Sequence, residues 1–280
     1  MDLRQKLMIK PGSKVKLKKI DPGWHGAFTS DDEAKEELAR NGKRLADLQQ
    51  LLYADRRHAL LIVLQGIDAA GKDGICWRVM GAMNPQGTYV KSFKVPTEEE
   101  RSHDFLWRVH AFTPGLGQVA VFNRSHYEDV LVARVHNLVP KKVWSARYEQ
   151  INAFEETLAA AGVTILKFFL YISPEEQLER FRDRLDDPTR QWKISESDYT
   201  ERERWGDYMD AYEAMLEKCS TDIAPWYVIP SNHKWFRNLA VSEIIEQALV
   251  GMKLEPPKPS VDIARIRAAY HSAVKNGTPG

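Results

Sequence analysis

Three residues have the spacing of a phosphate-binding loop: Gly66, Gly71 and Lys72, in the segment "LIVLQGIDAAGKDG", complete the pattern G-x-x-x-x-G-K. Glycines let backbone amides approach phosphate oxygens closely, and a lysine supplies positive charge to a phosphoryl group in transfer. The apolar run before the loop and the helical pattern after it suit such a site, whereas an ordinary glycine-rich strand–helix turn is the alternative. The residues that we expect to bind phosphate through this loop are Gly66, Ala69, Ala70, Gly71 and Lys72.

The loop also contains two carboxylates. The position after Lys72 is Asp73, where a nucleotide-binding loop of this kind usually has a Ser or Thr hydroxyl for magnesium. Asp68 lies at the expected crest of the loop, so we predict that it holds Mg²⁺ directly or through water; a plain turn residue is the alternative. A carboxylate next to phosphate is repelled unless a cation lies between them, so we expect Asp73 to turn away and cap the following helix.

A second polar group follows the apolar segment "VAVFN". In folds of this type an acid at the end of such a strand binds the metal, but here the position is Asn123. The negative charge must then come from the loop carboxylate and from Glu128 and Asp129, while Arg124 can clamp phosphate oxygens through two hydrogen bonds. The alternative is that these residues are only the polar start of a helix.

Basic residues crowd into the segment "ERFRDRLDDPTRQWK", which contains Arg180, Arg182, Arg184, Arg190 and Lys193. Arg180 and Arg184 are four positions apart and so share one helix face. In a phosphoryl-transfer enzyme, a helical lid at about residues 180–210 would carry such side chains over the phosphates. A solvated charged helix, paired with the neighbouring aspartates, is the alternative.

The apolar patterns predict five strands that alternate with helices. Each strand is a short and nearly continuous apolar run, which is typical of a parallel sheet buried on both faces. The alternation predicts an α/β fold with a doubly wound, mainly parallel sheet. The predicted strands are 59–65, 88–95, 118–123, 163–173 and 224–230. The main predicted helices are 30–54 with Ser30 as N-cap, 96–112, 124–136, 141–161, 173–185 with Ser173 as cap, one that ends near 218, and 235–250.

The charge balance, the number of cysteines and the absence of long apolar runs each exclude some classes of protein. Lys plus Arg (40) nearly equals Asp plus Glu (39) in 280 residues, and the net charge of +1 argues against a nucleic-acid-binding surface along the whole chain but allows a local basic groove. Cys76 and Cys219 are too few and too far apart for a disulfide framework or a zinc site, so we expect reduced thiols. Without a signal-peptide pattern or an apolar run of about 18 residues, the chain is expected to be soluble, cytoplasmic and free of membrane contacts.

Five segments together resemble one known family. They are "GIDAAGKDG", "SFKVPTEEE", "FNRSHYEDVLVARVH", "RFRDRLDDPTRQWKIS" and "STDIAPWYVIPSNHKWFRNL", in this order. They are similar to the motifs of the family-2 polyphosphate kinases, over about residues 10–250. The N-R-S-H-Y-E-D form resembles the class III branch more than class I, in which the strand ends in Asp-Arg-Ser-Trp-Tyr.

The resemblance implies a thymidylate-kinase-like P-loop fold and reversible phosphoryl transfer between inorganic polyphosphate and adenine or guanine nucleotides. For class III it implies AMP and ADP as acceptors, giving ADP and ATP, with Mg²⁺ (or Mn²⁺), and a homo-oligomer, either dimer or tetramer. It implies catalytic roles for Asp68, Lys72, Arg124 and the lid residue Arg184. The residues that it places toward the nucleotide are Asn123, Glu128 and Asp129; the asparagine departs from class I, which argues against a direct metal role there.

The expected substrate also has a physical signature. Polyphosphate carries a negative charge on every unit and has no base, so its site should be a basic groove with salt-dependent affinity. A local groove reconciles a polyanionic substrate with a net charge near zero. The residues that we expect to line it are Lys94, Arg101, Arg108, Arg180, Arg184, Arg190 and Lys193.

The chain divides into an irregular basic N-terminal arm (1–28), a P-loop kinase domain (29–250) and a C-terminal tail (251–280) with a short helix after a proline-rich linker. Two rival functions stay open. One is an ATP-dependent kinase of nucleosides or nucleoside monophosphates on the same fold, and the other is a polyanion-binding protein without catalysis. The sequence does not decide which nucleotide is preferred or which direction of transfer dominates.

Overall fold

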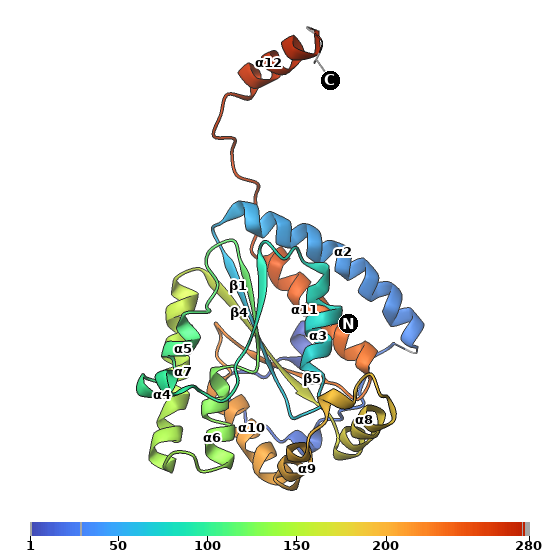
Figure 1. The fold of residues 1–280 in the computed structure, drawn as a ribbon, viewed down its shortest axis with the longest axis vertical. Coiled ribbons are helices and arrows are strands. Elements are labelled where there is room, and N and C mark those ends of the chain that lie inside the picture. The colour runs from blue at the N-terminus through green and yellow to red at the C-terminus, as the bar shows by residue number, and fades with distance from the viewer. Residues whose placement is uncertain (1, 29, 276, 278–280) are drawn as a thin grey trace.

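A sheet of five parallel strands forms the centre of the molecule (Figure 1). The computed structural model describes residues 2–28, 30–275 and 277. The strands are hydrogen-bonded in the order β2-β3-β1-β4-β5. Their bounds are β1 Ala59–Gln65, β2 Thr88–Ser92, β3 Val119–Asn123, β4 Val163–Tyr171 and β5 Trp226–Pro230. The predicted α/β fold with a parallel five-stranded sheet is confirmed, although every strand except β1 is slightly shorter than predicted.

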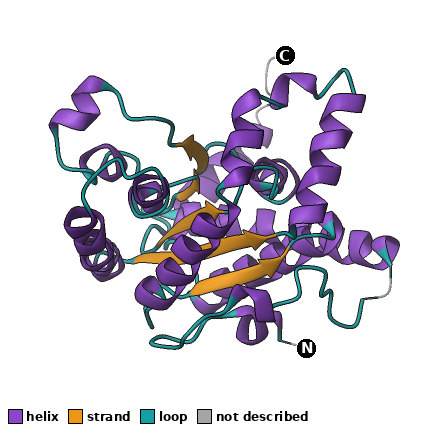
Figure 2. Cartoon of the chain, turned by 90° about the horizontal axis from the view of Figure 1, so that it is seen from below, coloured by secondary structure: helices purple, strands orange, loops and turns teal. Residues whose placement is uncertain are grey.

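The central strand β1 shows why helices cover the sheet on both faces. All seven of its residues are buried, and its side chains alternate between two hydrophobic clusters. Leu60, Ile62 and Leu64 pack on one face, and Leu61 and Val63 pack on the other. Because both faces are apolar, both need a layer of helices, which Figure 2 shows.

The two helical layers come from separate parts of the chain. On the face of Leu60 lie α1 (Leu3–Leu7), α2 (Asp31–Asp55), α3 (Lys72–Arg78), η2 (Met80–Ala82) and α11 (Lys234–Gly251). On the opposite face lie α5 (Trp107–His110), α6 (Val132–Val135), α7 (Lys141–Ala160) and α10 (Trp205–Cys219). Helix α2 begins after the predicted N-cap Ser30, whose hydroxyl accepts a hydrogen bond from the amide of Glu33. Among the described residues, no helix is long and apolar enough to cross a membrane.

The predicted helix 96–112 is two short helices in the structure. Thr97, rather than Pro96, starts α4 (Glu98–Ser102), because Thr97 and Glu100 form a capping box. His103 has an extended backbone that ends α4, and the chain becomes helical again only at α5.

The predicted helix 124–136 is also broken. Arg124 has a left-handed backbone with φ 62°, and Ser125 is extended, so the chain turns sharply after β3 before it can coil. The 3-10 turn η3 (His126–Asp129) comes next along the chain, and α6 comes after it. This turn determines which polar side chains after β3 face the site.

The segment predicted as a lid, about residues 180–210, covers the second half of α8 (Pro174–Asp186), then η4 (Gln191–Lys193), α9 (Glu196–Glu203) and the start of α10. Helix α8 begins after Ser173, whose hydroxyl accepts a hydrogen bond from the amide of Glu176, as the sequence predicts. In Figure 1, α8 and α9 lie beyond the carboxyl end of the sheet. They therefore stand at the same edge as the glycine loop and the end of β3.

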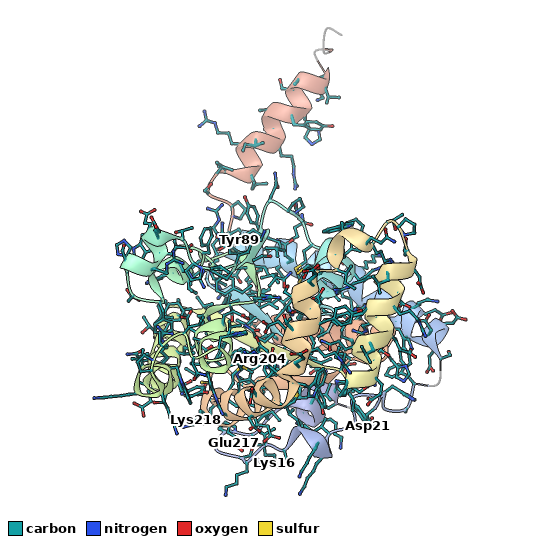
Figure 3. All side chains as sticks on the ribbon, turned by 60° about the horizontal axis from the view of Figure 1, so that its bottom comes forward. Lys16, Asp21, Tyr89, Arg204, Glu217 and Lys218 are labelled. Atoms are coloured by element: carbon teal, nitrogen blue, oxygen red, sulfur yellow. The ribbon has the colours of Figure 1, made fainter. Side chains whose placement is uncertain are left out.

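The N-terminal arm is less irregular than the sequence predicts. It contains α1 and η1 (Leu17–Lys19), and Met8 forms an antiparallel bridge with Tyr227 on the edge strand β5. Its buried apolar residues are Leu3, Leu7, Val15 and Leu17. Lys16 of the arm lies beside Glu217 of α10 (Figure 3). The carboxylate of Glu217 accepts a hydrogen bond from the backbone amide of Val15 in the arm. The arm is thus attached to both layers of the fold.

The C-terminal tail stands apart from the rest of the molecule. Helix α12 (Ile263–Lys275) follows a linker of about ten residues and projects away from the sheet (Figure 1). All the residues of α12 are exposed. Whether arm, central domain and tail fold as separate units stays a prediction.

Candidate active site

The loop between β1 and α3 has the backbone that close approach to an anion requires. Gly71 has φ 107°, and a Cβ there would lie 1.8 Å from Nη1 of Arg237. At Gly66 a Cβ would lie 2.8 Å from a carbonyl oxygen of β4. Among the described residues, none accepts a hydrogen bond from the amides of Gly71, Lys72 and Asp73. These amides are therefore free to donate to a phosphate group.

Lys72 lies at the base of this loop. It is 8% exposed, and its Nζ donates hydrogen bonds to the carbonyl oxygens of Gly66 (2.5 Å) and Ile67 (3.3 Å). Burial, together with the positive charge of Arg124, lowers the pKa of Lys72 to about 8. The negative charge of a bound phosphate would raise the pKa of Lys72 again, so this ammonium group is placed to bind an anion.

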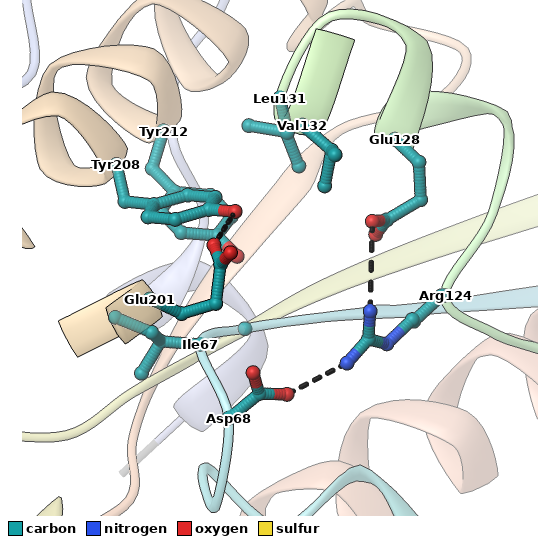
Figure 4. Close-up of a pocket in the computed structure, with 10 residues that line it drawn as sticks. Ile67, Asp68, Arg124, Glu128, Leu131, Val132, Glu201, Tyr208 and Tyr212 are labelled. Atoms are coloured by element: carbon teal, nitrogen blue, oxygen red, sulfur yellow. Dashed lines mark hydrogen bonds and ion pairs between the residues drawn. The ribbon is translucent and has the colours of Figure 1, made fainter. Parts of the chain in front are cut away.

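Asp68 and Arg124 face each other across the loop (Figure 4). Nη2 of Arg124 lies 2.6 Å from Oδ1 of Asp68, and Nη1 lies 3.9 Å from Oε2 of Glu128. The left-handed turn after β3 holds Arg124 in this position, and its amide donates to the carbonyl oxygen of Leu64. Burial raises the pKa of Glu128, although the charges of Arg124 and Lys72 oppose the rise. The structure thus brings these four predicted site residues together.

Asn123 and Asp73 form a contact that the sequence analysis does not predict. Nδ2 of Asn123 donates a hydrogen bond to Oδ1 of Asp73 at 2.7 Å. Asp73 lies in the first turn of α3, but the N-cap is Gly71 and no side chain caps this helix. The predicted capping role of Asp73 is therefore wrong, because its carboxylate turns toward β3 and lines the cavity in front of the loop.

Asp129 points away from the loop. Its Oδ1 accepts a hydrogen bond from Arg147 at 2.9 Å, and Oδ2 lies 4.0 Å from Arg108. In a 3-10 turn, neighbouring side chains point about 120° apart, so Asp129 and Glu128 cannot face the same cavity. Only Glu128 lines a cavity at the loop. The prediction that Asp129 faces the nucleotide is contradicted by this geometry.

A large cavity, here called the basic cavity, opens in front of the loop and has a volume of about 1010 Å³. Nine Lys or Arg and four Asp line it, although the whole chain has a net charge of only +1. The cationic residues are Lys72, Lys94, Arg124, Arg180, Arg184, Arg190, Lys193, Lys234 and Arg237. Such a local excess of positive charge attracts polyanions.

Arg101 and Arg108 lie outside the basic cavity, so the prediction that both line the groove is wrong. Arg108 is 6% exposed; its Nη1 donates to the carbonyl oxygen of Lys94 at 2.8 Å and lies 3.4 Å from Glu100. Arg101 donates to the carbonyl oxygen of Pro96. Arg108 therefore supports the backbone that carries Lys94 and does not line the basic cavity.

Arg180 holds the loop backbone. Its Nη1 donates to the carbonyl oxygens of Ala69 (2.8 Å) and Ala70 (3.0 Å), and its Nη2 donates to two carbonyl oxygens between β5 and α11. Its Nε pairs with Glu176 at 2.7 Å. Because every nitrogen of this guanidinium has a protein acceptor, Arg180 positions the loop and is not free to bind phosphate as predicted.

The lid carries three further predicted cations. Nη1 of Arg184 donates to the carbonyl oxygen of Lys193 at 3.1 Å and lies 3.7 Å from Asp198, which joins α8 to η4 and α9. Arg190 pairs with Asp187 at 2.9 Å, yet 55% of its side chain is exposed. Arg184, Arg190 and Lys193 all line the basic cavity, so the lid adds positive charge to the cavity that the loop also lines.

A smaller pocket of about 30 Å³, here called the tyrosine pocket, adjoins the basic cavity (Figure 4). It is lined by Gly66, Ile67, Asp68, Arg124, Glu128, Leu131, Val132, Glu201, Tyr208 and Tyr212. The hydroxyl of Tyr208 donates to Glu201 at 2.6 Å, and Nε2 of His136 lies 2.9 Å from the same carboxylate. Burial and Glu201 raise the pKa of Tyr208, so its hydroxyl stays protonated. Asp68 and Arg124 line both cavities.

Several of these residues were missed by sequence reasoning. Lys234 and Arg237 come from α11, and Glu201, Tyr208 and Tyr212 come from α9 and α10. The segment "HKWFRN" offers the one usable signal, because it directly follows the last strand and parallel strands end at a common edge. The tyrosines have the i, i+4 spacing of an ordinary core-facing helix, so nothing in the sequence marks them.

The carboxylates at the loop fit a magnesium ion that binds together with phosphates. Magnesium is usually held by one or two carboxylates plus water and substrate phosphates, and not by an all-protein cage. Asp68 and Asp73 line the basic cavity, and Glu128 shares the tyrosine pocket with Asp68. No group of three or more metal-binding side chains occurs in the described part of the chain, so phosphate oxygens would complete the coordination.

The sequence pattern of one family, Polyphosphate kinase 2 (PPK2), matches residues 28–257. The chain belongs to the polyphosphate kinase 2 family. It is 48% identical over 263 residues to the AMP/ADP-polyphosphate phosphotransferase of Meiothermus ruber, an alignment that covers 94% of this chain and 98% of that protein. It is 43% identical to the ADP-polyphosphate phosphotransferase of Rhodopseudomonas palustris, with 88% and 90% of the two chains covered. The family resemblance predicted from the sequence is confirmed.

A solved polyphosphate kinase 2 structure has the same fold. The crystal structure of Polyphosphate Kinase 2 from Arthrobacter aurescens TC1 matches with a TM-score of 0.94 and 44% sequence identity, and 98% of each chain is covered. This chain therefore has the P-loop kinase fold of the polyphosphate kinase 2 family. The resemblance to the class III branch agrees with the relative from Meiothermus ruber, whose name includes both AMP and ADP.

Proposed function

We propose that this polyphosphate kinase 2 protein transfers a phosphoryl group from inorganic polyphosphate to AMP and ADP, giving ADP and ATP, in a reversible reaction. The observation that carries the proposal is the basic cavity, where nine cationic residues gather around the free amides of the loop. A long chain of phosphates needs positive charge over this whole volume, whereas a single nucleotide needs much less. The polyphosphate phosphotransferase names of the relatives support the same reading.

The two cavities differ in chemistry in a way that matches two substrates. The basic cavity suits polyphosphate. The tyrosine pocket contains the carboxylates of Asp68, Glu128 and Glu201, which repel phosphate but accept hydrogen bonds from ribose hydroxyls or an adenine amino group. Tyr208 and Tyr212 add aromatic surface for a base or a sugar. The pocket, at about 30 Å³, is too small to enclose a nucleoside, so we assign to its lining residues only the contact with one edge of the acceptor's sugar or base.

The reacting groups then meet where the cavities meet, at Asp68 and Arg124. The loop amides and Lys72 hold the terminal phosphoryl group of polyphosphate, and the planar guanidinium of Arg124 can bind oxygens of donor and acceptor together. An oxygen of the AMP or ADP phosphate attacks this phosphorus in line, the bond to the bridging oxygen breaks, and the shortened polyphosphate leaves with that oxygen. The attacking oxygen is already ionised, so positioning and charge neutralisation suffice without a general base.

The lid completes the charge balance. Arg184, Arg190 and Lys193 line the same cavity as the loop and stabilise the negative charge of the leaving polyphosphate chain. When bound on Asp68, Mg²⁺ (or Mn²⁺) would supply further neutralisation of the phosphate oxygens.

The deciding experiment uses the donor. The purified chain is incubated with ADP, Mg²⁺ and polyphosphate but no nucleoside triphosphate, and ATP is followed. ATP formation supports the proposal, whereas an ATP-dependent nucleoside or nucleoside monophosphate kinase would form none. A time course with AMP then separates acceptors: ATP that accumulates after ADP indicates that both are used, and a stop at ADP restricts the acceptor to AMP.

The non-catalytic rival, a polyanion-binding protein, would bind polyphosphate without Mg²⁺ dependence and yield no product in the same assay. The site argues against this rival, because the free loop amides, Lys72 and Arg124 all gather where a phosphoryl group would be transferred. Binding of polyphosphate alone does not require such convergence. Guanine nucleotides are tested as acceptors in the same way. The name of a GDP-polyphosphate phosphotransferase from Mycolicibacterium smegmatis, 33% identical, makes that test worthwhile.

Two further expectations remain proposals. A cytoplasmic location is supported by the two free cysteines, which suit a reducing compartment. A homo-oligomer, dimer or tetramer, is supported by α12, where Ile263, Ile266 and Tyr270 are 46%, 51% and 65% exposed on an isolated helix. A 13-residue helix is marginal by itself in water, so contact with another copy would stabilise it.

A further inference from the structure

Arg237 is a buried guanidinium without an acidic partner. It is only 4% exposed, and its nearest acceptors are the side-chain oxygen of Asn238, at 2.8 Å from Nη2 and 3.2 Å from Nε, and the carbonyl oxygen of Ala70, at 3.4 Å from Nη1. Among the described residues, no carboxylate lies within ion-pair distance of it. A buried guanidinium without an ion-pair partner is unfavourable, so Arg237 favours the binding of an anion beside it.

The positive charge of the neighbouring Arg180 makes the surroundings of Arg237 still more favourable for an anion. Arg180 also donates to the carbonyl oxygen of Ala70, at 3.0 Å, so two guanidinium groups converge on one backbone oxygen. Glu176 pairs directly with Arg180 at 2.7 Å and acts on Arg237 only through a weaker, longer-range attraction. Burial, and then the charge of Arg180, lowers the pKa of Arg237 to about 9.

The loop is shaped around this guanidinium. A Cβ at Gly71 would lie 1.8 Å from Nη1 of Arg237, and one at Gly74 would lie 2.7 Å from Nη2. Any other residue at either position would displace the guanidinium. Arg237 lines the basic cavity together with Lys234, one helical turn earlier on α11, whose side chain is 53% exposed and whose Nζ lies 3.4 Å from Asp183 of the lid.

We propose that Arg237 and Lys234 form a second phosphate subsite, which holds a unit of the polyphosphate chain next to the one bound by the loop amides and Lys72. The proposal rests on the proposed function, because it names where the donor chain runs. Neither residue lines the tyrosine pocket, so the subsite serves the donor and not the nucleotide. From this subsite the chain continues toward Arg190 and Lys193 of the lid, which line the same cavity.

The subsite is tested with Lys234→Ala and Arg237→Met, measured as KM for polyphosphate and for ADP. Each loses one charge-assisted contact to phosphate, so KM for polyphosphate should rise about fivefold for the exposed Lys234 and more than about tenfold for the buried Arg237. KM for ADP should stay within about twofold. The dependence of polyphosphate affinity on salt should fall by a slope of about one in Lys234→Ala. The matched control is Lys35→Ala, an exposed, ion-paired lysine on α2 outside both cavities.

Wild-type turnover of ADP with polyphosphate is measured first, so that failure of the function is separate from failure of the subsite. The proposal is overturned if the wild type turns over but Lys234→Ala leaves KM for polyphosphate unchanged, or raises KM for ADP equally. Circular dichroism and the melting temperature show whether Arg237→Met folds. If it does not fold, Lys234→Ala decides, because that residue is exposed and its loss leaves the core intact.

Discussion

At the scale of single residues, Asp68 and Arg124 are the two side chains that both cavities share, and Lys72 is the buried charge beneath them. Replacing Lys72 or Asp68 with Ala should abolish phosphoryl transfer, with a loss of at least about a thousandfold, since each removes electrostatic stabilisation at the reacting phosphoryl group. Initial rates with ADP and polyphosphate measure the loss. Far-UV circular dichroism should show an intact fold, and turnover near the wild-type rate in either variant would refute the assignment.

The same lysine predicts a pH dependence. Because the pKa of Lys72 is about 8, the free site is mostly charged at pH 7 and mostly neutral at pH 9. The dissociation constant for polyphosphate should therefore rise about tenfold between these values, since binding needs the charged form. Calorimetric titration with polyphosphate at constant ionic strength measures it. An affinity that does not change over this range would mean that Lys72 is fully charged in the free protein.

At the scale of elements, the lid contributes charge that the loop alone does not provide. The double variant Arg190→Ala/Lys193→Ala should raise KM for polyphosphate about tenfold and lower its salt dependence, because two cations leave the basic cavity. KM for ADP should change little. Arg182→Ala is the matched control, since Arg182 is 65% exposed on α8, pairs with Glu179 and lines neither cavity. Equal effects of the two variants would contradict a specific role for the lid cations.

A buried ion pair connects the elements beneath the site. Glu155 of α7 lies 2.5 Å from Lys167 of β4 and 3.3 Å from His126 of η3, and all three are fully buried. Burial opposes ionisation of Glu155, but Lys167 and His126 lower its pKa below the usual value. The pair therefore stabilises the fold above the usual carboxyl pKa, and that contribution is lost when the pH falls through the lowered value.

Glu155→Ala should lower the free energy of unfolding by about 3–5 kcal/mol, because it leaves Lys167 charged and unpaired in the core. Urea denaturation measures this change at neutral pH. Glu156→Ala, at the next and exposed position of the same helix, should change it by less than about 0.5 kcal/mol. A similar small loss for both variants would show that Lys167 finds another partner.

At the scale of the whole molecule, charge is distributed unevenly: the net charge is +1, but the basic cavity has nine cationic and four acidic residues. The protein can thus bind a polyanion without being basic over its whole surface.

The C-terminal tail is the second feature of the whole molecule, because α12 buries none of its residues.

Ile266→Asp should therefore lower the molar mass measured by light scattering toward that of one chain, since it places a charge in the exposed apolar stripe of α12. Arg267→Ala, the neighbouring change outside the stripe, should leave the mass unchanged. If both variants keep the wild-type mass, self-association does not use this helix.

The sequence by itself determined the features that depend on neighbours along the chain. The strand β1, the glycine loop, the caps at Ser30 and Ser173 and the order of strands and helices follow from local patterns, and the structure has all of them. The motifs around the loop also sufficed to indicate the family, because their spacing is specific. These signals are local, so no contact between distant segments was needed to find them.

Only the tertiary structure decided which side chains face the substrate. Arg180 satisfies its donors on the loop backbone about 110 positions away, and Asp129 turns toward Arg147, because a left-handed residue after β3 sets the direction of η3. Arg237 meets the loop across 167 positions. Whether a charged residue binds substrate or supports the fold depends on the partners that reach it in space, and the sequence pattern does not contain those partners.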